Sequence, residues 1–193
     1  LQAINAIIAR PCSESKTPVR DVSQDEVIAK IIGYDLWKQN KNSSSCNSGG
    51  AHLHFIVADR IANKMIVKNP FNYLKSADNI NCSGIDKDGR CYAGDPFNPI
   101  NSIDSWNWPI DPAITLNQGY GYTWAVKNTW VGKIYDFHNG LDIIGTSENV
   151  KAVQPGKLYS DAYVGSNNCA LQYVCVDHKD SGIDTFYLHV NYN

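Results

Sequence analysis

The chain has little positive charge and no long apolar segment. Its 193 residues carry 17 Lys and Arg against 19 Asp and Glu, so the formal net charge is −2 and no basic footprint for nucleic acid is present. Apolar stretches such as residues 4–9 and 28–32 are far too short to span a bilayer. The start of the chain also lacks the features of a signal peptide. We therefore expect a soluble, mature domain without a nucleic-acid partner and without membrane insertion.

Cysteine pairs of the Cys-x-x-Cys type, which indicate zinc knuckles or redox sites, are also absent. Disulfides explain the cysteines better, and their even number indicates a secreted or periplasmic protein, with buried free thiols as the alternative. Cys82 and Cys91 flank a turn rich in Gly and Asp, so we predict a disulfide-closed hairpin between them. The pairing of the other four cannot be deduced from the sequence. These four are Cys12, Cys46, Cys169 and Cys175.

Regular helix is scarce as well. The best candidate covers residues 23–38, where Ser23 can cap, Glu26 follows three residues later, and Gly33 weakens the pattern. Elsewhere short β-branched or alternating runs are separated by Gly, Asn, Asp and Pro, which is typical of strands. The expected strands are residues 53–57, 64–67, 141–144, 150–153, 171–176 and 185–190. The sequence thus predicts one mainly β domain with one short helix.

A stretch with three prolines and two tryptophans covers residues 98–112. Large aromatic side chains such as Trp106 and Trp108 usually find a surface to pack against. We therefore expect an ordered connection here rather than a flexible linker.

What the chain does have is a small number of histidines in short clusters. His52 and His54 are two residues apart, and His138 and Asp142 are four apart. In a strand beginning near residue 137, His138 and Asp142 would point to the same face, as would His52 and His54 in a strand of their own. Two histidines and one carboxylate can hold zinc and leave a fourth position for water, which is the arrangement of a hydrolytic zinc centre. Each cluster alone is more often a solvated or core pair than a metal site.

Together the motifs resemble those of the lysostaphin-type zinc metalloendopeptidases, which cut bacterial peptidoglycan. The matching motifs are His-x-Gly-x-Asp at residues 138–142, Tyr-x-His at residues 187–189 and His-x-His at residues 52–54. The resemblance extends over residues 106–193 and about 46–60. Residues 60–105 more loosely resemble an extra segment of the secreted β-lytic branch, which can be read simply as a hairpin covering a sheet edge.

The resemblance implies a role for each motif residue. His54, His138 and Asp142 would be the zinc ligands, and His52 and His189 would be catalytic histidines that do not bind the metal. These roles agree with hydrolytic chemistry, in which one imidazole takes a proton and another steadies the charged intermediate. For the remaining histidine, His178, a structural or supporting role is favoured over a role as ligand.

The motif order differs from that of the family, because His-x-His precedes the other two motifs in this chain. A circular permutation would explain the order, with residues 1–60 forming the C-terminal half of the family fold, 61–105 an accessory hairpin and connection, and 106–193 the N-terminal half. Exchange of halves between two neighbouring chains, or an artificial rearrangement of the chain, would explain it too.

The resemblance implies an antiparallel β-sheet with a groove, one Zn²⁺ and hydrolysis of peptidoglycan peptides. Two alternatives from other classes stay open. One is an inactive relative that binds cell-wall peptide or a partner and regulates other hydrolases. The other is a structural or adhesive domain in which a fourth protein ligand such as His178 closes the zinc site.

Overall fold

The computed structural model describes residues 8–14, 18–32, 52–62, 64–75, 81–82, 106–110, 115–120, 138–144, 147–164 and 170–192. In chain order the elements are η1 (Cys12–Glu14), β1 (Pro18–Val22), β2 (Val27–Ile31), β3 (Leu53–Ile61), β4 (Lys64–Lys68), η2 (Pro70–Asn72), β5 (Asn81–Cys82), β6 (Thr115–Gln118), β7 (Leu141–Ile144), β8 (Asn149–Lys151), β9 (Gly156–Val164), β10 (Ala170–His178), β11 (Ile183–Leu188) and β12 (Val190–Asn191). The predicted mainly β class is confirmed. Across these ranges no helix has the length and apolar character needed to cross a membrane.

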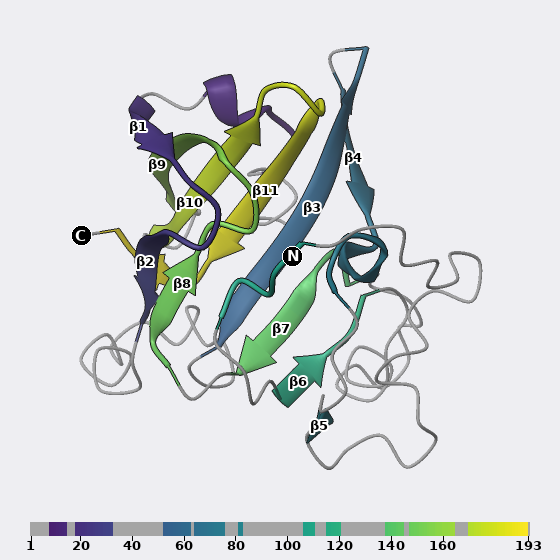
Figure 1. The fold of residues 1–193 in the computed structure, drawn as a ribbon, viewed down its shortest axis with the longest axis vertical. Coiled ribbons are helices and arrows are strands. Elements are labelled where there is room, and N and C mark those ends of the chain that lie inside the picture. The colour runs from purple at the N-terminus through teal and green to yellow at the C-terminus, as the bar shows by residue number, and fades with distance from the viewer. Residues whose placement is uncertain are drawn as a thin grey trace.

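The strands form one large sheet and one small sheet (Figure 1). The large sheet has nine strands in the order β1-β9-β10-β11-β3-β7-β6-β5, with β4 paired to β3. Its pairs are antiparallel apart from β5 and β6, which run parallel. The small sheet has three strands in the order β12-β2-β8. Strand β3, from the first third of the chain, therefore lies between β11 and β7, which come from its last third.

Strand β3 is buried on both faces. Leu53, Phe55 and Val57 pack into the larger apolar cluster together with residues of β7, β8 and β11. Ile56 and Ala58 point the other way, into a second cluster built mainly on β10 and β11. Because a strand alternates its side chains between faces, burial of both sets fixes β3 as a central strand and makes its register strongly specified.

The helix predicted over residues 23–38 is wrong over the described part, where a turn and strand β2 stand instead. The expected capping contact does form, since the Ser23 N–H donates to Glu26 Oε2 at 2.8 Å. Asp25, however, has a φ of 64°, which turns the chain back rather than into a helix. Strand β2 then pairs with β8 and β12, so long-range pairing overrides the local helical pattern.

The predicted ordered connection is confirmed at residues 106–110. Trp106 is buried and forms an isolated parallel bridge with Leu74. Its ring also lies 4.9 Å from the ring of Tyr73, measured between centroids. The aromatic side chains thus hold this connection against the segment that follows β4.

A disulfide joins Cys12 to Cys175 over a sequence separation of 163 residues. Both cysteines are fully buried, and the bridge ties η1 to strand β10. The predicted partner of Cys82, Cys91, lies outside the described residues, and Cys82 itself belongs to β5, which pairs in parallel with β6. That bridge stays a prediction.

Replacing both Cys12 and Cys175 by serine is expected to lower the free energy of unfolding by about 2–5 kcal/mol, because the bridge closes a very long loop of the unfolded chain. Urea unfolding followed by circular dichroism measures the change. Adding a reducing agent to the native protein should have a similar effect, whereas the double variant should respond less to it. An unchanged unfolding midpoint in the double variant would contradict the prediction.

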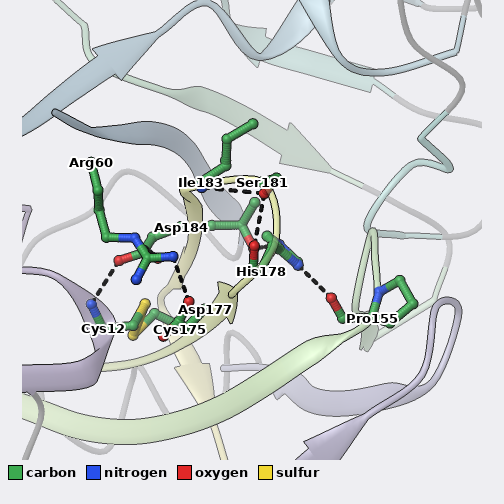
Figure 2. A network of polar contacts seen from close by, with 10 residues as sticks. Cys12, Arg60, Pro155, Cys175, Asp177, His178, Ser181, Ile183 and Asp184 are labelled. Carbon is green, nitrogen blue, oxygen red and sulfur yellow. Dashed lines mark hydrogen bonds and ion pairs between the residues drawn. A yellow bond between two sulfur atoms is a disulfide. The ribbon is translucent and has the colours of Figure 1, made fainter.

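Beside this disulfide lies a polar cluster around Arg60, drawn in Figure 2. Arg60 Nη2 donates to Asp177 Oδ1 at 2.6 Å, and Arg60 Nε lies 3.3 Å from Asp184 Oδ1. The Cys12 N–H donates to Asp184 Oδ2 at 2.8 Å. Asp177 and Asp184 stand directly opposite each other on β10 and β11. The guanidinium of Arg60 therefore forms ion pairs with two buried carboxylates.

Candidate metal centre

Three neighbouring strands bring the motif residues together. On β3, His54 stands directly opposite Asp142 of β7 on one side and Leu188 of β11 on the other. Side chains of directly opposed residues on antiparallel strands are close neighbours. His189 follows Leu188 immediately, so the pairing of β3 with β7 and β11 carries all three motifs to one place. All three motifs are thus brought together by residues of a single chain.

His54, His138 and Asp142 form a compact group, the metal group. Each offers one ligand atom, and these atoms all lie within 4.8 Å of one another. Asp142 Oδ1 lies 2.7 Å from His54 Nδ1 and 3.3 Å from His138 Nε2. All three residues are buried. The predicted ligand set is therefore in a geometry that can hold one metal ion.

The position of His138 differs from the expected one. Strand β7 begins at Leu141, so His138 precedes the strand and does not belong to it. The chain bends at Gly140, and a Cβ added there would lie 2.5 Å from the Phe55 carbonyl oxygen and 2.9 Å from His54 Nε2. Only glycine permits this close approach. The bend, rather than strand alternation, places His138 beside Asp142.

The histidine rings are oriented by acceptors on their far nitrogens. His138 Nδ1 lies 2.6 Å from the Gly119 carbonyl oxygen, and His54 Nε2 lies 3.1 Å from Asn139 Oδ1. A neutral imidazole that donates from one nitrogen presents a lone pair at the other. In that tautomer the lone pairs of His138 Nε2 and His54 Nδ1 would point toward the Asp142 carboxylate. A divalent metal ion bound among the three ligand atoms would take up these lone pairs, so this donor set fits such an ion.

The electrostatics of the group follow from burial and from charge pairing. Burial disfavours the ionised carboxylate, but His138 and His54 outweigh it and hold the pKa of Asp142 well below its ordinary value. Burial lowers the pKa of His54, and its contacts with Asp142 do not compensate. For His138, burial is opposed by Asp142 and the Gly119 carbonyl, and the pKa is raised. Asp142 is thus an anion at neutral pH, as a ligand must be.

His52 and His189 lie next to the group. His52 precedes β3, and its Nε2 lies 3.6 Å from Asp142 Oδ1. The rings of His52 and His189 lie 4.6 Å apart, and His189 lies 6.4 Å from the ring of His54, measured between centroids. Burial, reinforced by the neighbouring histidines, lowers the pKa of His189 to about 3, which makes this imidazole neutral.

The backbone of His189 is left-handed, with a φ of 63°. This conformation is uncommon for a residue other than glycine and needs support from its surroundings. The support comes from the small sheet, because the Ile32 N–H donates to the His189 carbonyl at 3.0 Å and β12 pairs with β2 immediately afterwards. The chain thus turns sharply between β11 and β12, and the imidazole is directed at the metal group.

His178 does not join the group. It ends β10, opposite Ile183 at the start of β11, roughly 20 Å along the strand from the end where His189 lies. Its Nδ1 lies 2.8 Å from the Pro155 carbonyl oxygen and its Nε2 lies 2.9 Å from Thr185 Oγ1 (Figure 2 shows the Pro155 contact). One ring nitrogen contacts Pro155, just before β9, and the other contacts Thr185 of β11, so His178 is not placed to close a metal site.

A cavity of about 470 Å³ opens beside His178, at the far end of β10 from the metal group, and is lined in part by Trp106 and Pro155. None of His54, His138 and Asp142 lines it. The metal group, rather than this cavity, is the candidate functional site.

Sequence reasoning missed Asn139 and Gly119, whose oxygens lie within hydrogen-bond distance of His54 and His138. Asn139 sits inside the His-x-Gly-x-Asp motif and is 4% exposed, so its place in the motif was the available signal. Gly119 contributes only a carbonyl oxygen, which no side-chain pattern reveals. Comparisons with protein-family models, with curated proteins and with solved structures gave no match.

Proposed function

We propose that this protein is a zinc-dependent endopeptidase of the lysostaphin type that hydrolyses peptide cross-links or stem peptides of bacterial peptidoglycan. The observation that carries the proposal is the convergence of His54, His138 and Asp142 in one buried group, with two further histidines beside it. A site with two imidazoles and one carboxylate suits zinc and leaves the metal able to take a further ligand.

In this proposal His54, His138 and Asp142 hold the metal. When bound, zinc supplies Lewis acidity, which polarises a peptide carbonyl and makes water a competent nucleophile near neutral pH. Asp142 also lowers the net charge of the loaded site, and burial of all three ligands keeps competing solvent away from them.

His189 and His52 supply the proton chemistry. An imidazole can accept a proton from an attacking water, and His189 lies beside both His52 and His54. The second imidazole then serves to donate a hydrogen bond to the oxyanion of the tetrahedral intermediate. The two rings are close enough to act on one reacting peptide unit.

The compartment that we propose is extracellular or periplasmic. The disulfide between Cys12 and Cys175 supports it, because structural disulfides persist in oxidising compartments. A protein in either of these compartments also has access to peptidoglycan.

The test of the function is mass spectrometry of purified peptidoglycan incubated with the protein, with and without a zinc chelator. New peptide termini that disappear with the chelator and return with added zinc are the expected result, and the masses name the bond that is cut. Intact peptidoglycan despite bound zinc would contradict the enzyme and favour the inactive, wall-binding alternative.

His189→Ala is expected to keep zinc bound and to lower kcat by about 10²–10⁴-fold, because it removes a group that moves a proton and not a ligand. Zinc content by atomic absorption and turnover on a peptidoglycan peptide are the two measurements. His178→Gln is the matched histidine control, for which lower stability with normal zinc content and turnover is expected. Full activity of His189→Ala would show that the role is assigned to the wrong residue.

A further inference from the structure

Asn139 is the residue between a proposed metal ligand and the glycine bend. Its side chain is buried, and its Oδ1 lies 3.1 Å from Nε2 of His54, which is on β3. We propose that Asn139 is a positioning residue for metal binding, and that it directs Nδ1 of His54 at the metal by accepting the ring's Nε2–H. The inference rests on the metal site of the proposed function and adds a residue to it.

The His54 ring lies between two oxygen acceptors. One nitrogen, Nδ1, lies 2.7 Å from Asp142 Oδ1 inside the metal group, and the other, Nε2, faces Asn139 outside it. Both neighbours are oxygen acceptors, while a neutral imidazole has one N–H to donate. If the N–H points to Asn139, the lone pair of Nδ1 points into the group, where a cation takes the place of the missing hydrogen.

The backbone at Gly140 brings Asn139 to this ring. Gly140 approaches so closely that a Cβ would lie 2.5 Å from the Phe55 carbonyl oxygen and 2.9 Å from His54 Nε2. A contact with a backbone oxygen cannot be relieved by moving a flexible side chain. The absence of a side chain at 140 therefore lets the segment lie against the ring, and Asn139 provides the acceptor there.

The hydrogen bond between His54 and Asn139 contributes more to metal binding than to the stability of the metal-free protein. Without a metal, the Asp142 carboxylate competes for the single ring proton, and a charged acceptor is the stronger competitor. With a metal ion on Nδ1, Asp142 no longer competes for the ring proton. The ring then carries the proton on Nε2 and donates it to Asn139 Oδ1. The bond is therefore worth more in the loaded protein than in the metal-free protein, and the difference appears as metal affinity.

The other proposed histidine ligand, His138, also has an oxygen acceptor at its far nitrogen. His138 has its far nitrogen, Nδ1, on the Gly119 carbonyl oxygen at 2.6 Å. A backbone carbonyl cannot be removed by substitution, but Asn139 can, so His54 is the ligand whose orientation is open to experiment. Losing such a supporting hydrogen bond typically weakens metal binding by about 10–100-fold.

The experiment is a zinc titration of the full chain in competition with a chromogenic chelator. Asn139→Leu, which keeps the branched shape but has no acceptor, is expected to bind zinc about 10–100-fold more weakly than the wild type. Asn139→Asp keeps an acceptor and should bind at least as tightly. Asn149→Leu, a half-buried asparagine on β8, is the matched control and should bind as the wild type does.

The outcomes distinguish this inference from the function on which it rests. Tight zinc binding by the wild type with unchanged binding by Asn139→Leu would overturn the role of Asn139 alone. No zinc binding by the wild type would overturn both the role and the proposed metal site.

A spectroscopic measurement covers the case in which Asn139→Leu does not fold. In zinc-loaded wild-type protein labelled with ¹⁵N-histidine, long-range ¹H–¹⁵N correlations should show His54 protonated at Nε2 and metal-bound at Nδ1. Coordination through Nε2 would overturn the inference whatever the variants do.

Discussion

Asp142→Asn is expected to abolish zinc binding and peptidoglycan hydrolysis together. The substitution keeps the size of the side chain and removes its charge, and Asp142 is the only anion of the described metal group. Two neutral imidazoles and an amide oxygen form a poor site, so the affinity should fall further than the ~10–100-fold seen when a supporting hydrogen bond is lost. Zinc content after dialysis and release of new peptide termini are the two measurements.

Asp180→Asn is the control for this variant, because Asp180 is exposed in the turn between β10 and β11. It should keep both zinc and activity. If Asp142→Asn retained zinc at wild-type affinity and hydrolysed peptidoglycan, the proposed ligand set would be wrong. Circular dichroism of the metal-free variant separates loss of the metal from loss of the fold.

Arg60→Leu is expected to lower the free energy of unfolding by about 3–5 kcal/mol at neutral pH, because it leaves buried carboxylates without their cation. Asp177 and Asp184 are 4% and 0% exposed, and Arg60 contacts both. Urea unfolding curves of the variant and the wild type measure the loss.

The loss from Arg60→Leu should shrink as the pH falls. Burial raises the pKa of Asp184 to about 6 in the folded protein, against an ordinary value of 3.8, and removal of Arg60 raises it further. A carboxyl with a raised folded-state pKa is destabilising above that pKa, where it is ionised, and the penalty disappears as the pH falls toward the unfolded value. Unfolding curves at pH 7 and near pH 4.5 should therefore show the larger difference at pH 7.

Arg20→Leu is the matched control, because Arg20 pairs with Glu26 on the surface. Exposed pairs contribute roughly 0–1 kcal/mol. If Arg60→Leu and Arg20→Leu lowered the free energy of unfolding by similar amounts, the stabilising role of the buried cluster around Arg60 would be contradicted. A loss for Arg60→Leu that does not change with pH would contradict it too.

Much of the candidate site could be predicted from the sequence, because most of its side chains are histidines and the chain has few of them. His52, His54, His138 and Asp142 were singled out by spacing and His189 by the family resemblance, and the structure brings them together. Their roles in binding and catalysis stay predictions. The expected strand through His138 was wrong, because a bend permitted by Gly140 has no periodic signal.

The strands were predictable where a short apolar run fits a strand and is too short for a helix. The runs at residues 53–57, 64–67 and 141–144 correspond to β3, β4 and β7. The helix predicted from Ser23 failed, since a capping contact and helical spacing are local signals, while Asp25 turns the chain and β2 finds its partners far away. Strand β9 was missed because polar residues interrupt its apolar pattern.

The sequence by itself determined the mainly β class and the residues able to bind a metal, because strand propensity and ligand chemistry belong to residue types and their spacing. Tertiary structure alone decided that β3 lies between β7 and β11, that Cys12 pairs with Cys175, and that Asn139 faces His54. These three facts join segments far apart along the chain. Pairing over such distances depends on how both faces of β3 are buried, which no local pattern contains.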